Sequence, residues 1–304
     1  MIWKTKTMRT RQENSLIFIL ILLLTFGGFF LYGDYERDME IKLLQEHEDS
    51  SIQTLTQKID ALEVEAKAIS IYDVDLNKKI YGKNDTTVLP MASLVKSLSV
   101  IVALEDETED QVRISPNAFK EEGDNGLYVD ELWDKKELAK FSLFVSSNDG
   151  VTALSENKQD FIDKLNEKAK KIGLEKTFFV NASGLDTEDE SGGAYTTAEE
   201  ANQLALFALR AEPEIFEVTK NMDTTFISYS GFEHKVLNTN IIAGNIPNLL
   251  FSKTGNTDLA GGNLTIVFKN DHDRTFAVTV LGSTQSGRFS DMQKIVTELQ
   301  GFML

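Results

Sequence analysis

The chain has 304 residues, of which 41% are hydrophobic and 26% charged, so it contains enough apolar material for one sizeable folded domain. Its formal net charge of −17 gives it no electrostatic attraction to nucleic acid, and we expect no nucleic-acid partner. Because the chain contains no cysteine, disulfides, thiolate metal sites and a cysteine nucleophile are excluded. Its histidines, His47, His234 and His272, have no metal-ligand spacing, so no metal is expected.

The first predicted element is a transmembrane anchor at residues 15–33. Twenty residues without a charge separate Glu13 from Asp34, and a helix of about 20 residues crosses the roughly 30 Å hydrocarbon core of a bilayer. Basic residues precede this stretch and acidic residues follow it. The positive-inside rule therefore predicts a cytoplasmic tail at 1–14 and an extracytoplasmic location for the rest. No Ala-x-Ala-like cleavage site follows, which favours an uncleaved anchor over a cleaved signal peptide.

Residues 34–66 are charged, contain no glycine or proline, and carry sparse apolar residues at helical spacing. This pattern predicts a solvated helical stalk or linker. The heptads are too few to predict a coiled-coil dimer, and the oligomeric state stays open.

From residue 67 the pattern changes to that of a folded domain. Two short β-like runs, AISIYDV and KKIYGK, are joined by a turn and predict a hairpin. A buried helix is predicted after Pro90, and three more helices follow, in DKKELAKFSLFV, KQDFIDKLNEKAKKIG and TAEEANQLALFALRA. The last third contains three strands, NLLFSKTG, GGNLTIVFKN and RTFAVTVLGS, and a final amphipathic helix. Strands at both ends with helices between them predict one α+β domain over 67–304, whose N- and C-terminal strands share an antiparallel sheet.

A serine and a lysine three residues apart open the helix predicted after Pro90, in the sequence SLVK at 93–96. This spacing puts Ser93 and Lys96 on one helix face, with the serine in the first turn, where the helix dipole favours negative charge. Burial lowers the pKa of a lysine, and a neutral amine can take the proton of a serine hydroxyl. A second copy of the spacing, SENK at 155–158, is polar throughout and is typical of a solvated face.

A second motif, SSN at 146–148, lies in a predicted loop between helices. The Ser146 hydroxyl could pass a proton between a base and a leaving group, and the Asn148 amide could bind a substrate carbonyl or hold the base. The alternative is a simple helix cap, and the sequence at 115–117 also has the pattern Ser-x-Asn.

A third motif, KTG at 253–255, stands near the end of a predicted apolar strand. The Lys253 cation and the Thr254 hydroxyl suit a substrate carboxylate, and Gly255 would let a substrate backbone pair closely with the strand edge. The three motifs occur in this order on a helix start, an interhelical loop and a strand. Together they form the motif set of the penicillin-recognising serine enzymes.

The surroundings of the motifs narrow this resemblance. The segments AISIYDVDLNKKIYGKNDTTVLPMASLVKSLSV, GLYVDELWDKKELAKFSLFVSSNDGVTAL, NASGLD with AYTTAEEANQLA, and NTN leading into FSKTGNTDLAGGNL are similar to D-alanyl-D-alanine carboxypeptidases, the low-molecular-mass penicillin-binding proteins. The resemblance covers roughly residues 67–304. It implies a β-lactamase/transpeptidase-like fold with a helical subdomain beside the sheet. This family usually has threonine where Val95 stands, and glycine or alanine where Ser147 stands.

The resemblance implies a serine-type D-Ala-D-Ala carboxypeptidase that removes the terminal D-alanine from peptidoglycan stem peptides through an acyl-enzyme on Ser93. Lys96 would be the base, Ser146 the proton relay, and Asn148 a contact of both substrate and Lys96. β-Lactam antibiotics would be covalent inhibitors, and no metal or organic cofactor is implied.

By the same resemblance, the substrate-binding residues are on the third motif. Lys253 and Thr254 would receive the terminal carboxylate, beside Gly255. The backbone N–H groups of Ser93 and Asn256 would form the oxyanion hole, in which each donor contributes roughly 3 kcal/mol to lowering the barrier.

Three alternative functions stay open at this point. A class A β-lactamase would need Glu-x-x-Leu-Asn after the second motif, but the nearest match has Ile162 where that glutamate is required. A D,D-endopeptidase differs from a carboxypeptidase only in loop shapes. A catalytically inactive wall-binding module would retain the fold and would not be labelled by a penicillin at Ser93.

Overall fold

The computed structural model describes residues 2–106, 110–123, 126–188 and 190–303. It contains two compact units, one ending at Thr54 and the other running from Leu55 to Met303. Each is described by itself.

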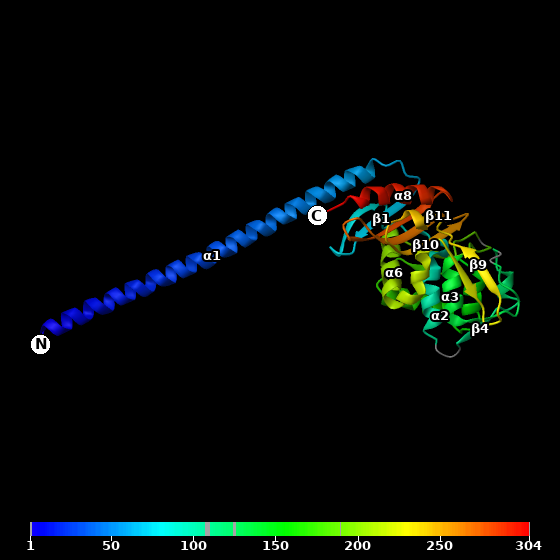
Figure 1. Cartoon of the computed structure of the whole chain (residues 1–304), viewed down its shortest axis with the longest axis horizontal. Helices are drawn as coiled ribbons and strands as arrows, with labels where there is room; N and C mark the ends of the chain where they lie inside the picture. The colour runs from blue at the N-terminus through cyan, green and yellow to red at the C-terminus, as the bar shows by residue number, and fades with distance from the viewer. Residues whose placement is uncertain (1, 107–109, 124–125, 189, 304) are drawn as a thin grey trace. The chain divides into compact units, whose positions relative to one another are not determined.

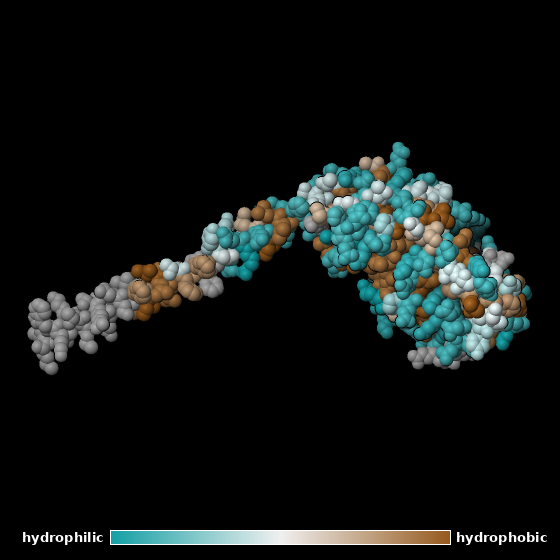
Figure 2. Space-filling model, in the orientation of Figure 1, coloured by the Kyte–Doolittle hydropathy of each residue, from teal (hydrophilic) through white to brown (hydrophobic). Residues whose placement is uncertain are grey.

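The first unit consists of the helix α1, Ile2–Asp60, up to Thr54. The large hydrophobic side chains described between Leu16 and Tyr32 are exposed, and Figure 2 shows this part of the helix as a brown stretch. Among the described residues, one helix is long and apolar enough to cross a membrane, judged by length and composition. From Ile2 on, the predicted tail, the anchor and the first part of the stalk form this helix without a break, and Met1 lies outside the described residues. The N-terminal apolar helix is therefore a candidate membrane anchor.

The second unit is built on a five-stranded antiparallel sheet with the order β10-β11-β12-β1-β2. Its strands are β1 Ala68–Asp73, β2 Lys78–Lys83, β10 Leu249–Thr257, β11 Gly261–Lys269 and β12 Thr275–Ser283. The first strand pairs directly with the last, Ile69 lying opposite Val280. The prediction that the two ends of the domain share one antiparallel sheet is thereby confirmed.

Helices cover both faces of this sheet, α8 Gly287–Gln300 on one and α6 Ala198–Ala211 on the other (Figure 1). Both were predicted from their periodicity. The helix α6 begins where the side chain of Thr197 accepts a hydrogen bond from the backbone N–H of Glu200. Covered on both faces, the central strands are apolar at nearly every position, as in β11, whose residues 262–268 are all buried.

A second group of helices surrounds α2, Lys96–Leu104. Its neighbours are α3 Lys135–Phe144, α4 Asn148–Ser155, α5 Phe161–Lys171 and α6. Eight of the nine residues of α2 are buried, which agrees with the predicted buried helix. The helix predicted directly after Pro90 begins, however, as a 3₁₀ turn, η1 Ala92–Val95, before α2 starts at Lys96.

Several short elements were not predicted. The strands among them are β3 Leu89–Pro90, β4 Gln111–Arg113, β5 Leu132–Asp134, β6 Phe178–Phe179, β7 Ala194–Thr196, β8 Asp223–Ile227 and β9 Glu233–Leu237. The helices among them are η2 Ala118–Lys120, α7 Pro213–Phe216, η3 Glu217–Lys220 and η4 Ala243–Asn245. Runs of two to five residues carry too little periodicity to be recognised, and most of these strands pair with partners distant in sequence.

The compact unit includes the last turn of α1. Leu55 and Ile59 are buried, at 3% and 1% exposure, and the carboxylate of Asp60 accepts a hydrogen bond of 2.8 Å from the Tyr81 hydroxyl. The carboxylate of Asp291 on α8 accepts hydrogen bonds from the backbone N–H groups of Glu65 and Ala66. The segment after α1 is therefore fixed to the unit before β1 begins.

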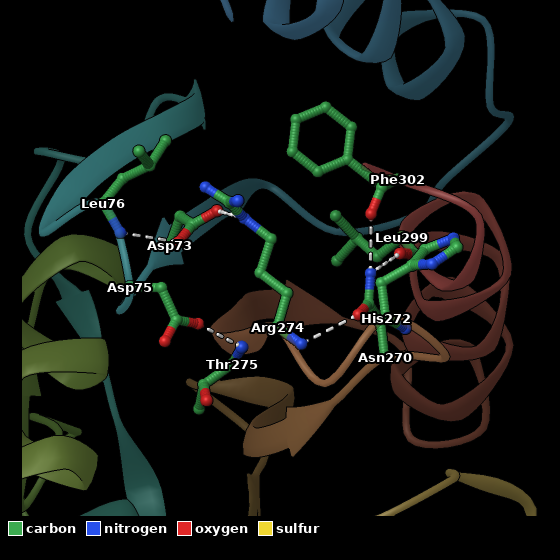
Figure 3. A network of polar contacts seen from close by, with 9 residues as sticks. All are labelled: Asp73, Asp75, Leu76, Asn270, His272, Arg274, Thr275, Leu299 and Phe302. Carbon is green, nitrogen blue, oxygen red and sulfur yellow. Dashed lines mark hydrogen bonds and ion pairs between the residues drawn. The ribbon is translucent and has the colours of Figure 1, made fainter. Parts of the chain in front are cut away.

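The turn between β11 and β12 is held by a polar network, which Figure 3 shows. The Arg274 guanidinium donates to the Asp73 carboxylate at the end of β1. The Asn270 amide donates to the carbonyls of Leu299 and Phe302, at 3.0 and 2.8 Å. This network joins the sheet to the end of α8.

Candidate active site

The three motifs meet in the second unit. Ser93 lies on η1, Ser146 and Asn148 lie at the junction of α3 and α4, and Lys253 lies on β10. The strand β10 packs against η1, so the first and third motifs are direct neighbours. Every residue that the sequence pointed to is thus in one region, although the motifs are far apart along the chain.

The Lys96 amine is at the centre of this region. It is fully buried and donates hydrogen bonds to the Ser93 hydroxyl at 2.6 Å, to Oδ1 of Asn148 at 2.7 Å and to the carbonyl of Ser183 at 2.7 Å. An ammonium group has three protons, and these three acceptors use all of them. If the amine loses one proton, the Ser93 hydroxyl can donate to it in return, which is the arrangement of an activated nucleophile.

The surroundings of Lys96 favour this loss. Burial lowers the pKa of the amine to about 7, while the carboxylates of Asp149 and Glu121 act to raise it. A large fraction of the amine is therefore neutral near pH 7, which suits a general base.

A second buried lysine connects the other two motifs. The Lys253 amine is 2% exposed and donates to the Ser146 hydroxyl at 2.8 Å and to the carbonyl of Thr254 at 2.8 Å. Burial lowers its pKa well below the usual value, and the positive charges of Lys96 and Arg288 lower it further. Ser146 itself has a left-handed backbone conformation with φ 59°, a strained geometry of the kind found at functional sites.

Gly255 lets β10 approach η1 closely. A Cβ atom at this position would lie 2.7 Å from the Met91 carbonyl oxygen and 3.2 Å from the Ser93 nitrogen. Only glycine fits this contact without a shift of one element. The next residue, Asn256, is exposed and still within β10.

Four residues around the motifs were not assigned by the sequence. The Ser183 carbonyl binds Lys96, and the Thr239 hydroxyl accepts a 2.8 Å hydrogen bond from the Thr254 hydroxyl. Both stand in segments used for the family resemblance, NASGLD and NTN, which could have pointed to them. Nothing in the sequence pointed to Glu121 or to Arg288.

The additional copies of the motifs lie elsewhere and have other roles. The expectation that SENK at 155–158 forms a solvated face is correct for Asn157, which is exposed, but wrong for Ser155, which is only 8% exposed. Lys158 is partly buried and pairs with Asp106 at 2.7 Å. At the second Ser-x-Asn pattern, the Ser115 hydroxyl accepts from the backbone N–H of Ala118 and so closes a turn.

A cavity of about 390 Å³ adjoins the site, lined among others by Glu121, Ile162 and Ser183. Among the described residues, no group of three or more His, Asp or Glu side chains is placed to hold a metal ion. The chemistry that the arrangement offers is that of a serine hydroxyl next to a buried amine. This pair suits acyl transfer through a covalent intermediate.

The known proteins that resemble this chain include D-alanyl-D-alanine carboxypeptidases and endopeptidases. The model of the D-alanyl-D-alanine carboxypeptidase family matches residues 53–284. The D-alanyl-D-alanine carboxypeptidase DacF of Bacillus subtilis is 28% identical over 76% of this chain, which spans 61% of that protein. A D-alanyl-D-alanine endopeptidase of Haemophilus influenzae is also 28% identical, over 78% of this chain and 82% of its own length.

The fold also matches solved structures. The crystal structure of penicillin-binding protein D2 from Listeria monocytogenes in its cefotaxime-bound form superimposes with a TM-score of 0.67 and 27% identity, over 78% of this chain and 98% of that one. This match confirms the predicted penicillin-binding-protein type of α+β fold. Because the model of the family matches most of the length of this chain, the chain belongs to the D-alanyl-D-alanine carboxypeptidase family, peptidase family S11.

Proposed function

We propose that this chain is a serine-type D-Ala-D-Ala carboxypeptidase that removes the terminal D-alanine from peptidoglycan stem peptides. The observation that supports it most is the buried Lys96 amine, which lies 2.6 Å from the Ser93 hydroxyl. The membership of the family supports the same activity.

Acylation begins when the Lys96 amine takes the proton of the Ser93 hydroxyl and Oγ attacks the carbonyl carbon between the two D-alanines. The oxygen of the tetrahedral intermediate is stabilised by the backbone N–H groups of Ser93 and Asn256. The C–N bond then breaks, and the leaving D-alanine nitrogen receives a proton through the Ser146 hydroxyl. Water hydrolyses the ester on Ser93, which releases the shortened peptide and restores the hydroxyl.

Substrate binding is assigned to the third motif and to Asn148. Lys253 and Thr254 receive the terminal carboxylate of the peptide, with Gly255 keeping the strand close to η1. The Asn148 side chain has its Oδ1 occupied by Lys96, and its Nδ2 group donates to the carbonyl of Glu122 at 2.6 Å. In the complex with substrate, Nδ2 exchanges its bond to Glu122 for a bond to a carbonyl oxygen of the bound peptide.

β-Lactam antibiotics are proposed to acylate the same serine. The Listeria monocytogenes relative, 27% identical, carries cefotaxime in its crystal structure. A penicillin or cephalosporin presents a strained amide in its β-lactam ring and a carboxylate on the fused ring, which suit the attack by Ser93 and the amine of Lys253.

D,D-endopeptidase activity is the second candidate. The endopeptidase of Haemophilus influenzae matches this chain over 82% of its length, whereas DacF is matched over 61% of its length. Both activities use the same acyl-enzyme on Ser93 and differ in whether the leaving group is free D-alanine or a cross-linked peptide.

The test is release of D-alanine from a peptide ending in D-Ala-D-Ala, with a cross-linked dimer peptide assayed beside it. We expect Ser93→Ala and Lys96→Ala each to abolish release and to abolish labelling by a fluorescent penicillin. The second SENK copy offers a matched control, because Ser155→Ala and Lys158→Ala have the same spacing and should retain activity. Release of D-alanine by the Ser93→Ala variant would refute the proposal.

We also propose an orientation for the anchor. Basic residues precede the apolar stretch and acidic residues follow it, which favours a cytoplasmic N-terminus and an extracytoplasmic catalytic unit. The chain would then be a single-pass membrane protein whose active site is on the side of the peptidoglycan.

A further inference from the structure

A buried arginine contacts the backbone of the candidate oxyanion hole. Arg288 is the second residue of α8 and is 8% exposed. Its Nη1 group donates a 2.6 Å hydrogen bond to the carbonyl oxygen of Gly255. Neither the motifs nor the family resemblance assigns a role to this residue.

The bonded carbonyl belongs to the same peptide group as the backbone N–H of Asn256. Peptide groups are planar, and this one is trans, so the N–H of Asn256 points away from the oxygen that Arg288 holds. A charge-assisted hydrogen bond to the carbonyl draws electron density toward the oxygen and makes the N–H on the other side of the group a better donor. The same bond fixes the rotation of the peptide plane.

The distances between η1 and β10 by themselves place this peptide group next to the nucleophile Ser93. A Cβ atom on Gly255 would lie 3.2 Å from the nitrogen of Ser93, so the residue that directly precedes Asn256 lies against the backbone of Ser93. The strand β10 is at the edge of the sheet, which leaves one side of it unpaired.

Two neighbours restrict the Arg288 side chain, while its buried Nε has no hydrogen-bond partner among the described residues. A Cβ atom on Gly262 would lie 3.2 Å from Cδ of Arg288, and the guanidinium carbon is 4.6 Å from the centre of the Phe289 ring. Burial lowers the pKa of Arg288 to about 10, so the group stays charged near pH 7. Burying a positive charge is costly, and here the Nη1 group of Arg288 binds a peptide oxygen and not a carboxylate.

We propose that Arg288 is a positioning residue of the oxyanion hole, which orients and polarises the Gly255–Asn256 peptide group so that Asn256 N–H stabilises the tetrahedral intermediate. The inference rests on the proposed function, because it needs an acyl-enzyme on Ser93. Arg288 acts through the backbone and does not touch the substrate.

The experiment compares wild type with Arg288→Met, Arg288→Gln and Arg288→Lys in the full chain in detergent. The probe is benzylpenicillin, labelled with ¹³C at its β-lactam carbonyl. Two quantities are measured: the rate constant of acylation, and the infrared stretching frequency of the acyl-enzyme ester carbonyl. A stronger oxyanion hole lowers that frequency, so it reports the donors directly.

We expect Arg288→Met to slow acylation roughly tenfold, less than the roughly 100- to 1000-fold loss caused by removing an oxyanion-hole donor itself. The ester carbonyl should move to higher wavenumber. Arg288→Lys, which keeps the charge, should recover part of both effects, and Arg288→Gln, which keeps a donor without charge, should recover less. These two variants also decide the question if Arg288→Met does not fold.

Arg274 provides a matched control, because it is another partly buried arginine at the other end of β12 (Figure 3). Arg274→Met should lower the melting temperature and leave the carbonyl frequency at the wild-type value. Slower acylation of the Arg288 variants with an unchanged carbonyl frequency would overturn the inference, because it would show a merely structural role. Absence of any acyl-enzyme in wild type would instead refute the proposed function.

Discussion

At the scale of single residues, the site depends on two buried lysines with separate partners. Lys96 binds Ser93 and Asn148, and Lys253 binds Ser146. Each positive charge makes the other less favourable, and the charge of Lys96 lowers the pKa of Lys253. Loss of the proton from Lys96 would remove that charge and so favour the protonated form of Lys253, which the proposed binding of a carboxylate requires.

The activity should depend on pH through the protonation of the Lys96 amine. Because a neutral Lys96 is the proposed base and its pKa is about 7, kcat/KM for D-alanine release should rise with pH through that value. The Glu121 carboxylate raises the pKa of Lys96, so Glu121→Gln should move the midpoint of the profile to lower pH. Activity measured below pH 7 should therefore increase relative to wild type.

A neighbouring residue offers the control for this prediction. Glu122→Gln removes the same charge from an exposed side chain, while the backbone carbonyl that binds Asn148 remains. Its pH profile should match that of wild type. A midpoint that moves equally in both variants would show that net charge, and not the location of Glu121, controls the base.

The middle residue of the second motif also has a local explanation. Ser147, where the family resemblance leads us to expect glycine or alanine, is buried, and its hydroxyl caps α4 by accepting from the N–H of Gly150 at 2.9 Å. The side chain therefore points into the protein and supports the helix start that carries Asn148.

At the scale of elements, the contact between α8 and the segment after α1 closes one end of the sheet. Asp291 is fully buried, and its carboxylate accepts from the N–H groups of Glu65 and Ala66 and from the Ser283 hydroxyl. These bonds fix the chain just before β1 and at the last residue of β12, and the two strands are neighbours in the sheet. The loss of this one carboxylate would leave several donors without a partner.

We therefore predict that Asp291→Ala destabilises the catalytic unit by about 3 kcal/mol, or roughly 10 °C in Tm, because buried donors lose a charged acceptor. Thr297→Ala on the exposed face of the same helix is the control and should change the unfolding free energy by less than about 0.5 kcal/mol. Thermal unfolding followed by circular dichroism measures both. Equal Tm values for the two variants would contradict the assignment of Asp291 as the connector.

At the scale of the whole molecule, the chain combines an exposed apolar helix with a catalytic unit that has its own core. The unit from Leu55 to Met303 contains every residue assigned to the site. It also contains the last turn of α1, where Leu55 and Ile59 are buried. The end of the helix is therefore part of the catalytic unit and not only a spacer.

This division predicts different effects of two deletions. A chain lacking residues 2–33 should unfold at the same temperature as the full chain and release D-alanine equally well. A chain lacking residues 2–60 loses the buried Leu55 and Ile59 and the Asp60–Tyr81 hydrogen bond, and should be about 4 kcal/mol less stable. Equal stability of the two shortened chains, in denaturant titrations, would refute a structural role for this turn.

The proposed orientation can be tested because the chain contains no cysteine. A membrane-impermeant maleimide added to intact cells should label Ser50→Cys, which is exposed on α1. It should label Thr7→Cys only after the cells are lysed. The reverse pattern would place the catalytic unit in the cytoplasm.

The sequence by itself determined the anchor pattern, the long strands and helices, and the order of the three motifs. These features depend on local periodicity and composition, in runs of six residues joined by a turn, as in β1 and β2, and in runs of nine or more, as in β10, β11 and α6. The residues that carry the motifs were therefore recognisable without any tertiary contact, as was the sharing of one sheet by the two ends of the domain.

Only the tertiary structure decided which groups surround the motifs. The effect of the Glu121 carboxylate on the pKa of Lys96 and the bond from Arg288 to Gly255 join residues far apart in the chain. The same holds for the burial of Ser155, which a polar local sequence hid. Local patterns specify elements, but desolvation and side-chain partners arise from how the elements pack, which the spacing of residues along the chain does not encode.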